Sequence, residues 1–395
     1  MNPDDLPLIQ DALREEGLDG WLFACFRGSD PVALKLLGLQ ERFMATRRWF
    51  YFIPAEGEPI RLCHGIEPDS LDSVPGRRVL YGRWQEWQAE LGRLLQGRRR
   101  LAVQFSPQSI VPALGRLDAG LADFLRDLGV ELCSSGDLVA RFEATLSDEQ
   151  EAGHLRAVQV LEACVEMAFD RVKSALRGGG MLSERALQRE MLAFMEARGL
   201  TTEAPPIVAV DAHAADPHYE PLEQGSAEIR PGQVLLLDLW GKERAKGAVY
   251  GDLTWCAWTG DAVPPEQAAV WDVVRRARDA GVAKAEEVAV RTVFGWEVDR
   301  AARDVVEAAG YGDAFIHRTG HSIHEEDHAD GANMDDYETH DTRRLLDRTV
   351  FSVEPGIYLK GRFGFRTEVN VLLKNGRARV TGKRQGSLPA LLVEG

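Results

Sequence analysis

Cysteine is scarce in this sequence, and none of it forms a recognisable pattern. The 395 residues include five cysteines, an odd and widely scattered number without any C-x-x-C pair: Cys25, Cys63, Cys133, Cys164 and Cys256. This distribution argues against both a disulfide framework and a cysteine-type zinc site. We therefore expect buried, reduced thiols and a cytoplasmic location.

Long apolar runs are also missing. No window approaches the roughly 20 consecutive apolar residues that a membrane-spanning helix needs, and the most apolar stretches, such as VLLLDLW at 234–240, are only strand-length. The first residues, MNPDDLPLIQ, place two acids where a secretory signal would have a basic region before an apolar run. We predict a soluble protein with no membrane partner and no export signal.

Positive charge is in deficit. Lysine and arginine total 47 against 62 aspartates and glutamates, which gives a formal net charge of −15. A chain this acidic repels phosphates, and its short basic stretch RRR at 98–100 has no interleaved aromatic residues. Nucleic acid is therefore excluded as a partner.

The composition that remains is that of an ordinary folded protein, with 45% hydrophobic and 28% charged residues. A single hydrophobic core stops growing at about 250 to 300 residues, so this length predicts two domains. The first, residues 1–144, alternates helical and strand patterns and is expected to be α/β. Its predicted elements are helices at 4–17, 84–97 and 116–128, and strands at 21–26, 49–54, 101–105 and 130–133.

The second domain is predicted over residues 145–395. Ser147 and Gln150 form a capping-box pattern that starts a long amphipathic helix ending at the glycines 178–180. Further helices are expected from Ser183 and at 265–280 and 296–309, and pairs of strands alternate with them. The pattern is that of an α+β domain.

Two of these strand pairs carry acids at equal spacing. The segment 234–258 places Asp238 and Asp252 on the two arms of a hairpin, and 350–373 does the same with Glu354 and Glu368. Each pair is 14 positions apart. Buried carboxylates cost several kcal/mol each unless a cation compensates them, and the neighbouring basic residues are too few to pair all four.

A histidine-rich run, HRTGHSIHEEDHAD, adds the fifth candidate ligand. It holds four of the nine histidines within twelve residues: His317, His321, His324 and His328. Four carboxylates and one imidazole suit Mn²⁺, Co²⁺, Fe²⁺ or Mg²⁺, and two such ions balance four charges and activate a water between them. Taken singly, each acid is more often a turn cap and the histidines could be a solvated loop, but the joint pattern favours a dinuclear site.

At these residues the chain resembles the creatinase, prolidase and aminopeptidase P superfamily, whose fold is called pita-bread. The motifs IVAVDAHAADPHYEP, DLW…YGDLT, HRTGHSIHEEDH, VEPGIY and RTEVNVLL occur in the family's order, and TRRWFYFIPAEGEP resembles a segment of its N-terminal domain. The resemblance implies a creatinase-like N-terminal domain over 1–144. It also implies a catalytic pita-bread domain over 145–395, with a curved, mostly antiparallel sheet.

The resemblance assigns roles to single residues. The implied ligands of two divalent metals, most simply Mn²⁺ with Co²⁺ or Zn²⁺ as alternatives, are Asp238, Asp252, His321, Glu354 and Glu368. Glu354 is also the implied general base.

Substrate contacts are implied as well. His218 and His328 match the pair that binds substrate and stabilises the tetrahedral intermediate, and His317 matches the histidine of the proline pocket. Arg366 is expected to fork onto a carboxylate, either Glu368 or a substrate C-terminus. Tyr358 is either a packed aromatic or a hydrogen-bond donor to the site.

The chain departs from the family pattern near the first two ligands. Trp240 replaces a glycine, and Tyr250 lies two rather than three residues before Asp252, after a longer link. Either a β-bulge restores the register or the tyrosine has lost its role. Ser322 and His324 also stand where glycines are common, so the walls of the site are expected to differ.

The activity implied is hydrolysis of the bond between a first residue and a following proline, which most peptidases cannot cut because proline lacks an N–H and fixes φ. We predict a dipeptidase acting on Xaa-Pro, because the chain is short and Trp240 and the acidic HEEDH loop narrow the cleft. The alternatives are an aminopeptidase P on longer peptides, a non-catalytic peptide-binding module on the same fold and a metal-free amidinohydrolase. The resemblance also implies a homodimer.

Overall fold

The computed structural model describes residues 5–39 and 45–393. The chain divides into two compact units, Met1–Glu143 and Ala144–Gly395. Within the described ranges, no helix combines the length and the apolar character needed to cross a bilayer.

The first unit is built on a mixed six-stranded sheet with the order β4-β3-β2-β1-β5-β6. β1 pairs antiparallel with β2 and parallel with β5, so sequence-distant segments meet at the sheet centre. The strands are β1 (Gly20–Cys25), β2 (Trp49–Pro54), β3 (Ile60–His64), β4 (Arg77–Tyr81), β5 (Arg100–Val103) and β6 (Glu131–Ser134). The helices are α1 (Asp5–Glu15), α2 (Pro31–Leu36), α3 (Trp84–Leu94), α4 (Ala119–Asp127) and α5 (Gly136–Glu143).

The sequence identified β1, β2, β5 and β6 of this unit but not β3 and β4. Every residue of β2 is buried, which is why its apolar run WFYFIP was recognisable. In β4, by contrast, only Tyr81 is buried, so the segment RRVLY lacks the apolar signal and was not predicted.

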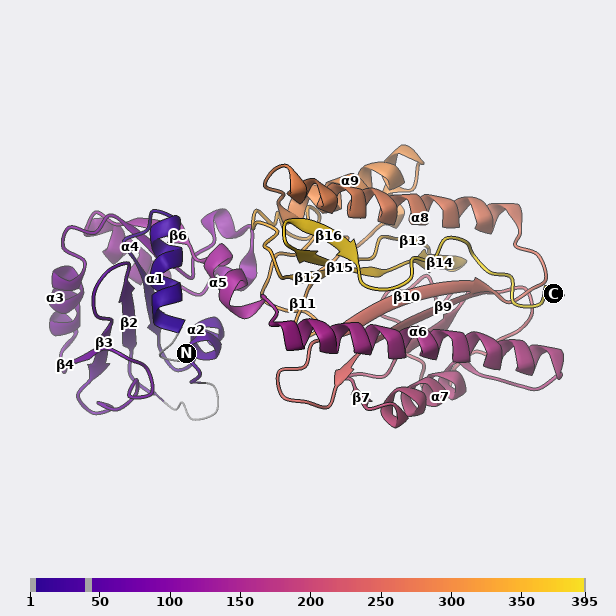
Figure 1. Ribbon diagram of the computed structural model, residues 1–395, viewed down its shortest axis with the longest axis horizontal. Helices are drawn as coiled ribbons and strands as arrows, with labels where there is room; N and C mark the ends of the chain where they lie inside the picture. Colours follow the sequence, from indigo (N-terminus) through magenta and orange to yellow (C-terminus); the bar gives the residue numbers. More distant parts are fainter. Residues whose placement is uncertain (1–4, 40–44, 394–395) are drawn as a thin grey trace. The chain divides into compact units, whose positions relative to one another are not determined.

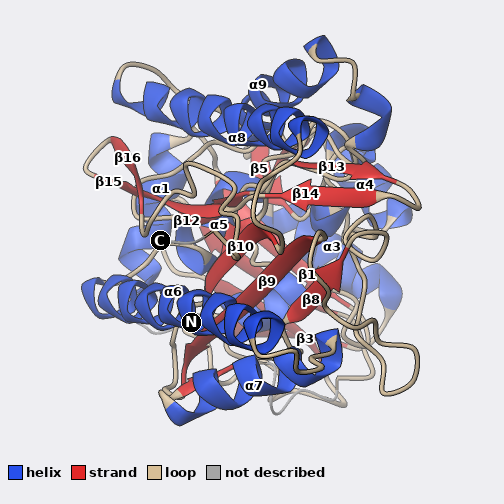
Figure 2. Cartoon of the chain, turned by 90° about the vertical axis from the view of Figure 1, so that its right-hand side faces the viewer, coloured by secondary structure: helices blue, strands red, loops and turns tan. Residues whose placement is uncertain are grey.

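The second unit contains four long helices: α6 (Asp148–Arg177), α7 (Glu184–Ala197), α8 (Pro265–Glu286) and α9 (Gly295–Ala308). The capping box predicted at its start is confirmed, because Ser147 Oγ accepts from the Gln150 N–H at 3.2 Å and Gln150 Oε1 accepts from the Ser147 N–H at 2.9 Å. α6 and α7 lie on one side of the strands and α8 and α9 on the other (Figures 1 and 2). Short 3-10 helices occur at Pro107–Ser109, Pro112–Leu114, Glu287–Ala289 and Gly312–Ala314.

In the part of this unit that the structure describes, the strands β7 to β16 pair antiparallel, as expected for this half of the chain. They form β10-β9-β7 with β8 joined to β9, then β11-β12-β15-β16, and a separate pair β13-β14. Their bounds are β7 (Leu200–Thr201), β8 (Ile207–Val210), β9 (Val234–Glu243), β10 (Gly251–Trp258), β11 (Ser322–Ile323), β12 (Val350–Val353), β13 (Gly356–Leu359), β14 (Phe363–Arg366), β15 (Val369–Lys374) and β16 (Arg377–Val380).

The second predicted hairpin differs from the expectation in one respect. Both of its arms are broken, β12 from β13 at Glu354 and β14 from β15 at Glu368, so neither glutamate lies inside a strand. The cause is that both backbone N–H groups turn to other segments: Glu354 donates to the Thr319 carbonyl at 2.7 Å and Glu368 to the Thr254 carbonyl at 3.1 Å. Pro355, which has no N–H, reinforces the first break.

Candidate metal centre

The two aspartates lie on neighbouring strands, as the sequence predicted. In the β9–β10 pair Asp238 lies opposite Thr254 and Asp252 opposite Trp240. Because side chains two apart in a strand share a face, the four positions present one surface. The register is continuous from Gly241↔Gly251 to Val234↔Trp258, so no bulge realigns this stretch.

The two broken strands bring the glutamates to the same surface. The Thr254 hydroxyl lies 2.9 Å from Glu368 Oε2 and 3.1 Å from Asp238 Oδ1 and so links those two acids. On the other arm, the Ser352 hydroxyl donates to Glu354 Oε1 at 3.1 Å.

His321 completes the convergence. Its Nε2 lies 3.4 Å from Asp252 Oδ2 and 3.3 Å from Glu354 Oε1. Single donor atoms of Asp252, His321 and Glu368 lie within 4.8 Å of one another, and all three side chains are buried. The structure therefore gathers the five side chains that the sequence proposed as ligands: Asp238, Asp252, His321, Glu354 and Glu368.

The oxygen atoms of this cluster that lack a hydrogen-bond partner indicate which kind of ligand it can bind. Among the described residues, the buried carboxylate oxygens without a hydrogen-bond partner are Asp252 Oδ1, Glu368 Oε1 and Asp327 Oδ1. A buried acceptor without a donor costs about 1 to 3 kcal/mol, and more when charged. Oxygen-rich donors with one imidazole are the ligand set of a hard or borderline divalent cation, so these residues fit such ions.

The protonation of the cluster leads to the same conclusion. Burial, and then the neighbouring carboxylates, raises the pKa of Asp252 and of Glu368 well above the usual range. Burial also raises the pKa of Asp238 despite the adjacent Arg366. Without added positive charge, these acids do not all ionise together.

Glu354 is different. Burial acts to raise its pKa, but the surrounding His321 and Arg366 outweigh burial and leave the pKa lowered. Its carboxylate is therefore the one that the chain itself holds ionised, which suits a proton acceptor.

Arg366 pairs with a different acid from the one considered in the sequence. Its Nη2 contacts Asp238 Oδ2 rather than Glu368, and its Nε lies 3.9 Å from Glu354 Oε2. The pair lies on the cavity side of β9, where Arg366 neutralises one of the clustered charges. Arg366 Nη1 also donates to the Tyr358 hydroxyl at 3.2 Å.

Tyr358 continues this chain of hydrogen bonds to His317. The His317 Nδ1 lies 2.7 Å from the Arg318 carbonyl, which can only accept, so Nδ1 carries the proton. His317 Nε2 then accepts from the Tyr358 hydroxyl at 2.8 Å. Burial lowers the pKa of His317 to about 4, so its ring is neutral. Of the two readings of Tyr358, the hydrogen-bonding one is confirmed.

A cavity of about 420 Å³ opens onto the cluster. Its lining includes all three further histidines that the sequence selected, and it is completed by both hairpins and the histidine-rich loop: Ile207, Pro217, His218, Asp238, Trp240, Asp252, His317, Arg318, His321, Asp327, His328, Glu338, Glu354 and Arg366. The predicted site residues other than Glu368 therefore face one cavity.

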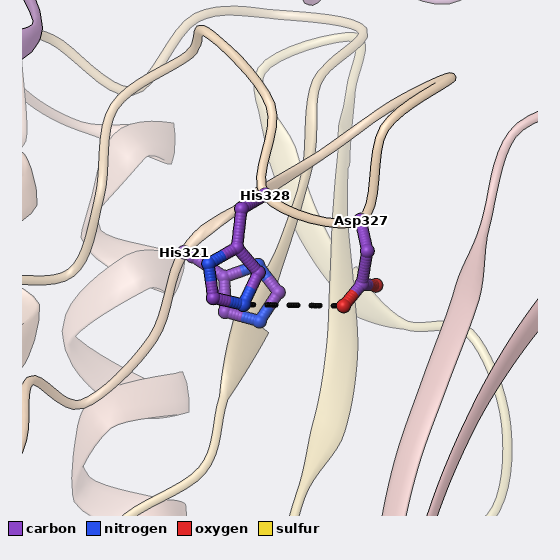
Figure 3. Close-up of side chains that lie close together, drawn as sticks. All are labelled: His321, Asp327 and His328. Carbon is purple, nitrogen blue, oxygen red and sulfur yellow. Dashed lines mark ion pairs between the residues drawn. The ribbon is translucent and has the colours of Figure 1, made fainter. Parts of the chain in front are cut away.

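Asp327 is the acid that the sequence interpretation missed. In Figure 3 its side chain extends towards the rings of His321 and His328, which lie against each other with centroids 4.0 Å apart. Asp327 Oδ2 lies 3.9 Å from His328 Nε2. The proximity of His321, followed by burial, lowers the pKa of His328 to about 3. The available signal was the acid directly before His328 in EEDH.

The loop that carries His218 is held by a residue outside the predicted set. Glu184, at the start of α7, has no exposed surface and accepts from the N–H groups of Val210 at 2.8 Å and Ala227 at 2.9 Å. It also bonds the Tyr219 hydroxyl at 2.7 Å and His213 Nδ1 at 2.9 Å. This acid anchors both ends of the 210–227 loop.

Comparison with known proteins places this site in a family. The chain is 27% identical over 345 residues to an uncharacterized peptidase of Staphylococcus saprophyticus, covering 84% of this chain and 87% of that one. It is 27% identical over 266 residues to an Xaa-Pro dipeptidase of Lactobacillus delbrueckii, covering 65% and 62%. The crystal structure of dipeptidase PepE from Mycobacterium ulcerans superposes with a TM-score of 0.65 at 23% identity, covering 98% and 97%.

The fold is the pita-bread fold that the resemblance implied, preceded by an α/β unit. The family model "Metallopeptidase family M24" matches residues 152–375, which is more than half of the chain and includes all five converging side chains. The chain therefore belongs to metallopeptidase family M24 of the creatinase, prolidase and aminopeptidase P superfamily.

Proposed function

We propose that this metallopeptidase is an Xaa-Pro dipeptidase whose two divalent metal ions are held by Asp238, Asp252, His321, Glu354 and Glu368. The observation that carries the proposal is the convergence of these side chains with the oxygens Asp252 Oδ1 and Glu368 Oε1 left without partners. Two divalent cations balance the four carboxylates. An Xaa-Pro dipeptidase among the relatives supports the substrate class.

When bound, the two cations supply a water of lowered pKa and polarise the scissile carbonyl. Glu354, which the chain keeps ionised, takes the proton from the attacking water and delivers it to the proline nitrogen as that nitrogen leaves. The Ser352 hydroxyl, 3.1 Å from Glu354 Oε1, and His321 fix the direction of this carboxylate.

The histidines are proposed to stabilise the charge that develops during attack. His218 and His328 line the cavity and are proposed to donate hydrogen bonds to the oxygen that gains charge during attack. The adjacent His321 is the main cause of the lowered pKa of His328 and keeps its ring neutral, so one of its nitrogens remains a hydrogen-bond donor without adding a charge.

The proline end is proposed to lie against His317. Its neutral ring is half-buried, packs edge-on to Phe315 with centroids 5.2 Å apart and is fixed by Tyr358, which gives a wall suited to an apolar ring. Arg366 is largely occupied by Asp238, so we propose that it orients that ligand as well as facing the substrate.

The decisive experiment removes metal with a chelator, restores Mn²⁺, Co²⁺ or Zn²⁺ singly, and assays Ala-Pro beside Ala-Pro-Ala. We expect no hydrolysis after chelation and restored cleavage of Ala-Pro, with little or none of the tripeptide. Full activity after chelation contradicts the metal centre, whereas cleavage of the tripeptide alone identifies an aminopeptidase instead.

Manganese as the physiological metal and a homodimer stay predictions of the resemblance, and a cytoplasmic location stays a prediction from the cysteine distribution. The restoration series tests the first, and light scattering of the purified chain tests the second.

A further inference from the structure

Glu184 is a buried acid that the proposed reaction does not use directly. It lies at the start of α7 and has no exposed surface. Its Oε1 bonds the Val210 N–H and His213 Nδ1, and its Oε2 bonds the Ala227 N–H and the Tyr219 hydroxyl. Both oxygens are satisfied within the protein, so Glu184 needs no ion or ligand from outside.

All of these bonding groups belong to one loop, residues 210–227. The two backbone N–H groups lie at its ends, and Tyr219 lies near its middle. The Tyr219 ring also stacks on the His213 ring, with centroids 4.2 Å apart and an angle of 22° between the planes. A single acid therefore ties the middle of the loop to both of its ends.

The middle of this loop carries His218, directly before Tyr219. His218 lines the cavity but is exposed, so packing does not fix its ring, and its place depends on the backbone on either side. Before His218, the Pro217 carbonyl accepts from Arg366 Nη1 at 3.4 Å. After His218, the Tyr219 hydroxyl donates to Glu184 at 2.7 Å.

The loop also lies directly against a strand of the site. Gly364 is in β14, and a Cβ at this position would lie 2.1 Å from the Ala214 carbonyl oxygen, so the loop touches the strand backbone itself. β14 ends at Arg366. This strand and Arg366 therefore hold the residues before the histidine, and the bond from Tyr219 to Glu184 holds the residue after it.

We propose that the hydrogen bond between Glu184 and Tyr219 positions His218 against the substrate oxygen that gains charge during attack. Glu184 does not line the cavity, so it is a positioning residue that acts through the histidine. A displacement of about 1 Å at such a site costs on the order of 100-fold in rate. This inference rests on the proposed Xaa-Pro activity and on the role of His218 in it.

The test measures kcat and KM on Ala-Pro in the metal-loaded full chain. The variants are Tyr219→Phe, which removes the hydroxyl and keeps the ring, His218→Ala and the two combined. Substituting Tyr219 rather than Glu184 leaves the buried N–H groups at the ends of the loop with their acceptor. The matched control Tyr51→Phe removes a hydroxyl of the first unit that donates to the Pro75 carbonyl at 2.9 Å.

The expected losses are in kcat. His218→Ala should lower kcat roughly 100-fold, because it removes a hydrogen bond made in the transition state. Tyr219→Phe should lower kcat roughly tenfold and change KM by less than about threefold. In the double variant kcat should equal that of His218→Ala, because a positioning bond has no effect once the imidazole is gone. Tyr51→Phe should keep the wild-type kcat.

Four results overturn the inference. An equal further loss from Tyr219→Phe in the His218→Ala background would show that the hydroxyl acts on the fold rather than through the histidine. A kcat of Tyr219→Phe within about twofold of the wild type would show that the histidine is held without this bond. A rise in KM alone would assign the loop to substrate binding. An equal loss in Tyr51→Phe would make the effect common to any lost hydroxyl.

The outcomes also distinguish this inference from the function on which it rests. If the wild type, loaded with each metal in turn, does not cleave Ala-Pro, the proposed dipeptidase activity fails, and the positioning role fails with it. If the wild type cleaves Ala-Pro and His218→Ala keeps full kcat, the activity stands and only the positioning role fails. Tyr219→Phe should match the wild type in metal content and thermal unfolding, and a loss of metal would contradict a role exerted through His218.

Discussion

Two groups of buried acids in the second unit differ in how they are satisfied. Asp299, Asp335 and Asp341 have no exposed surface, and each accepts hydrogen bonds from several donors. In the cavity, Asp252 and Glu368 are buried and Asp327 is half-buried, yet each leaves one buried oxygen without a donor.

The difference teaches how to separate structural acids from functional ones. Asp299 is bound on both oxygens by Arg303, at 2.9 and 3.0 Å, and also accepts from the Thr319 N–H at 2.8 Å. The protein itself therefore supplies donors to both oxygens of Asp299, and this residue stabilises the loop before His321. The cavity acids are complete only when a cation is present, and that requirement rather than burial marks the site.

The largest expected effect is on the cavity side of this comparison. Glu354→Gln removes both a proposed ligand and the proposed base, so kcat on Ala-Pro should fall by at least about 1,000-fold even at saturating metal. Steady-state kinetics with parallel metal analysis measure this. A variant that keeps a tenth of the wild-type kcat would remove Glu354 from the mechanism.

The second prediction concerns the satisfied acids. Asp299→Asn should lower the free energy of unfolding by about 3 to 5 kcal/mol, because Arg303, only 4% exposed, keeps its charge without its partner. Denaturant titration measures the loss. The metal content of the folded variant should stay that of the wild type; loss of metal without loss of stability would erase the distinction between the two groups.

The third prediction uses a satisfied histidine. His154 is fully buried, its Nδ1 lies 2.6 Å from the Tyr250 carbonyl and its Nε2 lies 2.7 Å from the Thr381 hydroxyl. Burial lowers its pKa to about 4, below the unfolded value of 6.5, so the unfolded chain binds the extra proton first.

Stability from His154 is therefore complete above pH 6.5 and is lost as the pH falls towards 4, by up to about 3 kcal/mol. Unfolding free energies of the wild type and His154→Gln across this range measure the term. The variant should have the flatter profile, and parallel profiles would show that His154 does not titrate this way.

The fourth prediction has the smallest expected effect but separates the two groups of acids most clearly. The sign of the change in stability should depend on whether metal is bound. Without metal, Asp252→Asn removes a carboxylate whose neighbours repel it, so the variant should be as stable as the wild type or more stable by about 1 to 2 kcal/mol. With metal, the wild type gains binding energy that the variant lacks and should unfold at the higher temperature. Destabilisation by equal amounts in both states would place Asp252 among the structural acids.

Much of this site followed from the sequence because its ligands lie on or beside strongly apolar strands. Asp238 and Asp252 interrupt runs such as VLLLDLW, where a polar residue is conspicuous. Glu354 and Glu368 have the same 14-residue spacing, which indicated that the two pairs of acids belong to one site. Long helices with clear caps, such as the one starting after Ser147, were equally accessible.

The features that the sequence could not predict lie in backbone that lacks the regular spacing of a helix or a strand. The breaks at Glu354 and Glu368 arise from hydrogen bonds to the distant Thr319 and Thr254. The pairing of Arg366 with Asp238 rather than with Glu368 depends on how separate strands meet. Asp327 lies in a loop where no alternation indicates which side chain faces inward, so only the fold distinguishes it from its exposed neighbours.

The central claim, that five converging side chains hold two divalent cations, is tested most directly by anomalous X-ray diffraction from crystals grown with Mn²⁺. The account predicts two peaks, with Asp252 Oδ1, Glu368 Oε1 and His321 Nε2 each within about 2.0 to 2.3 Å of one of them. No peak among these residues, or a peak elsewhere while these oxygens stay without a partner, would contradict it.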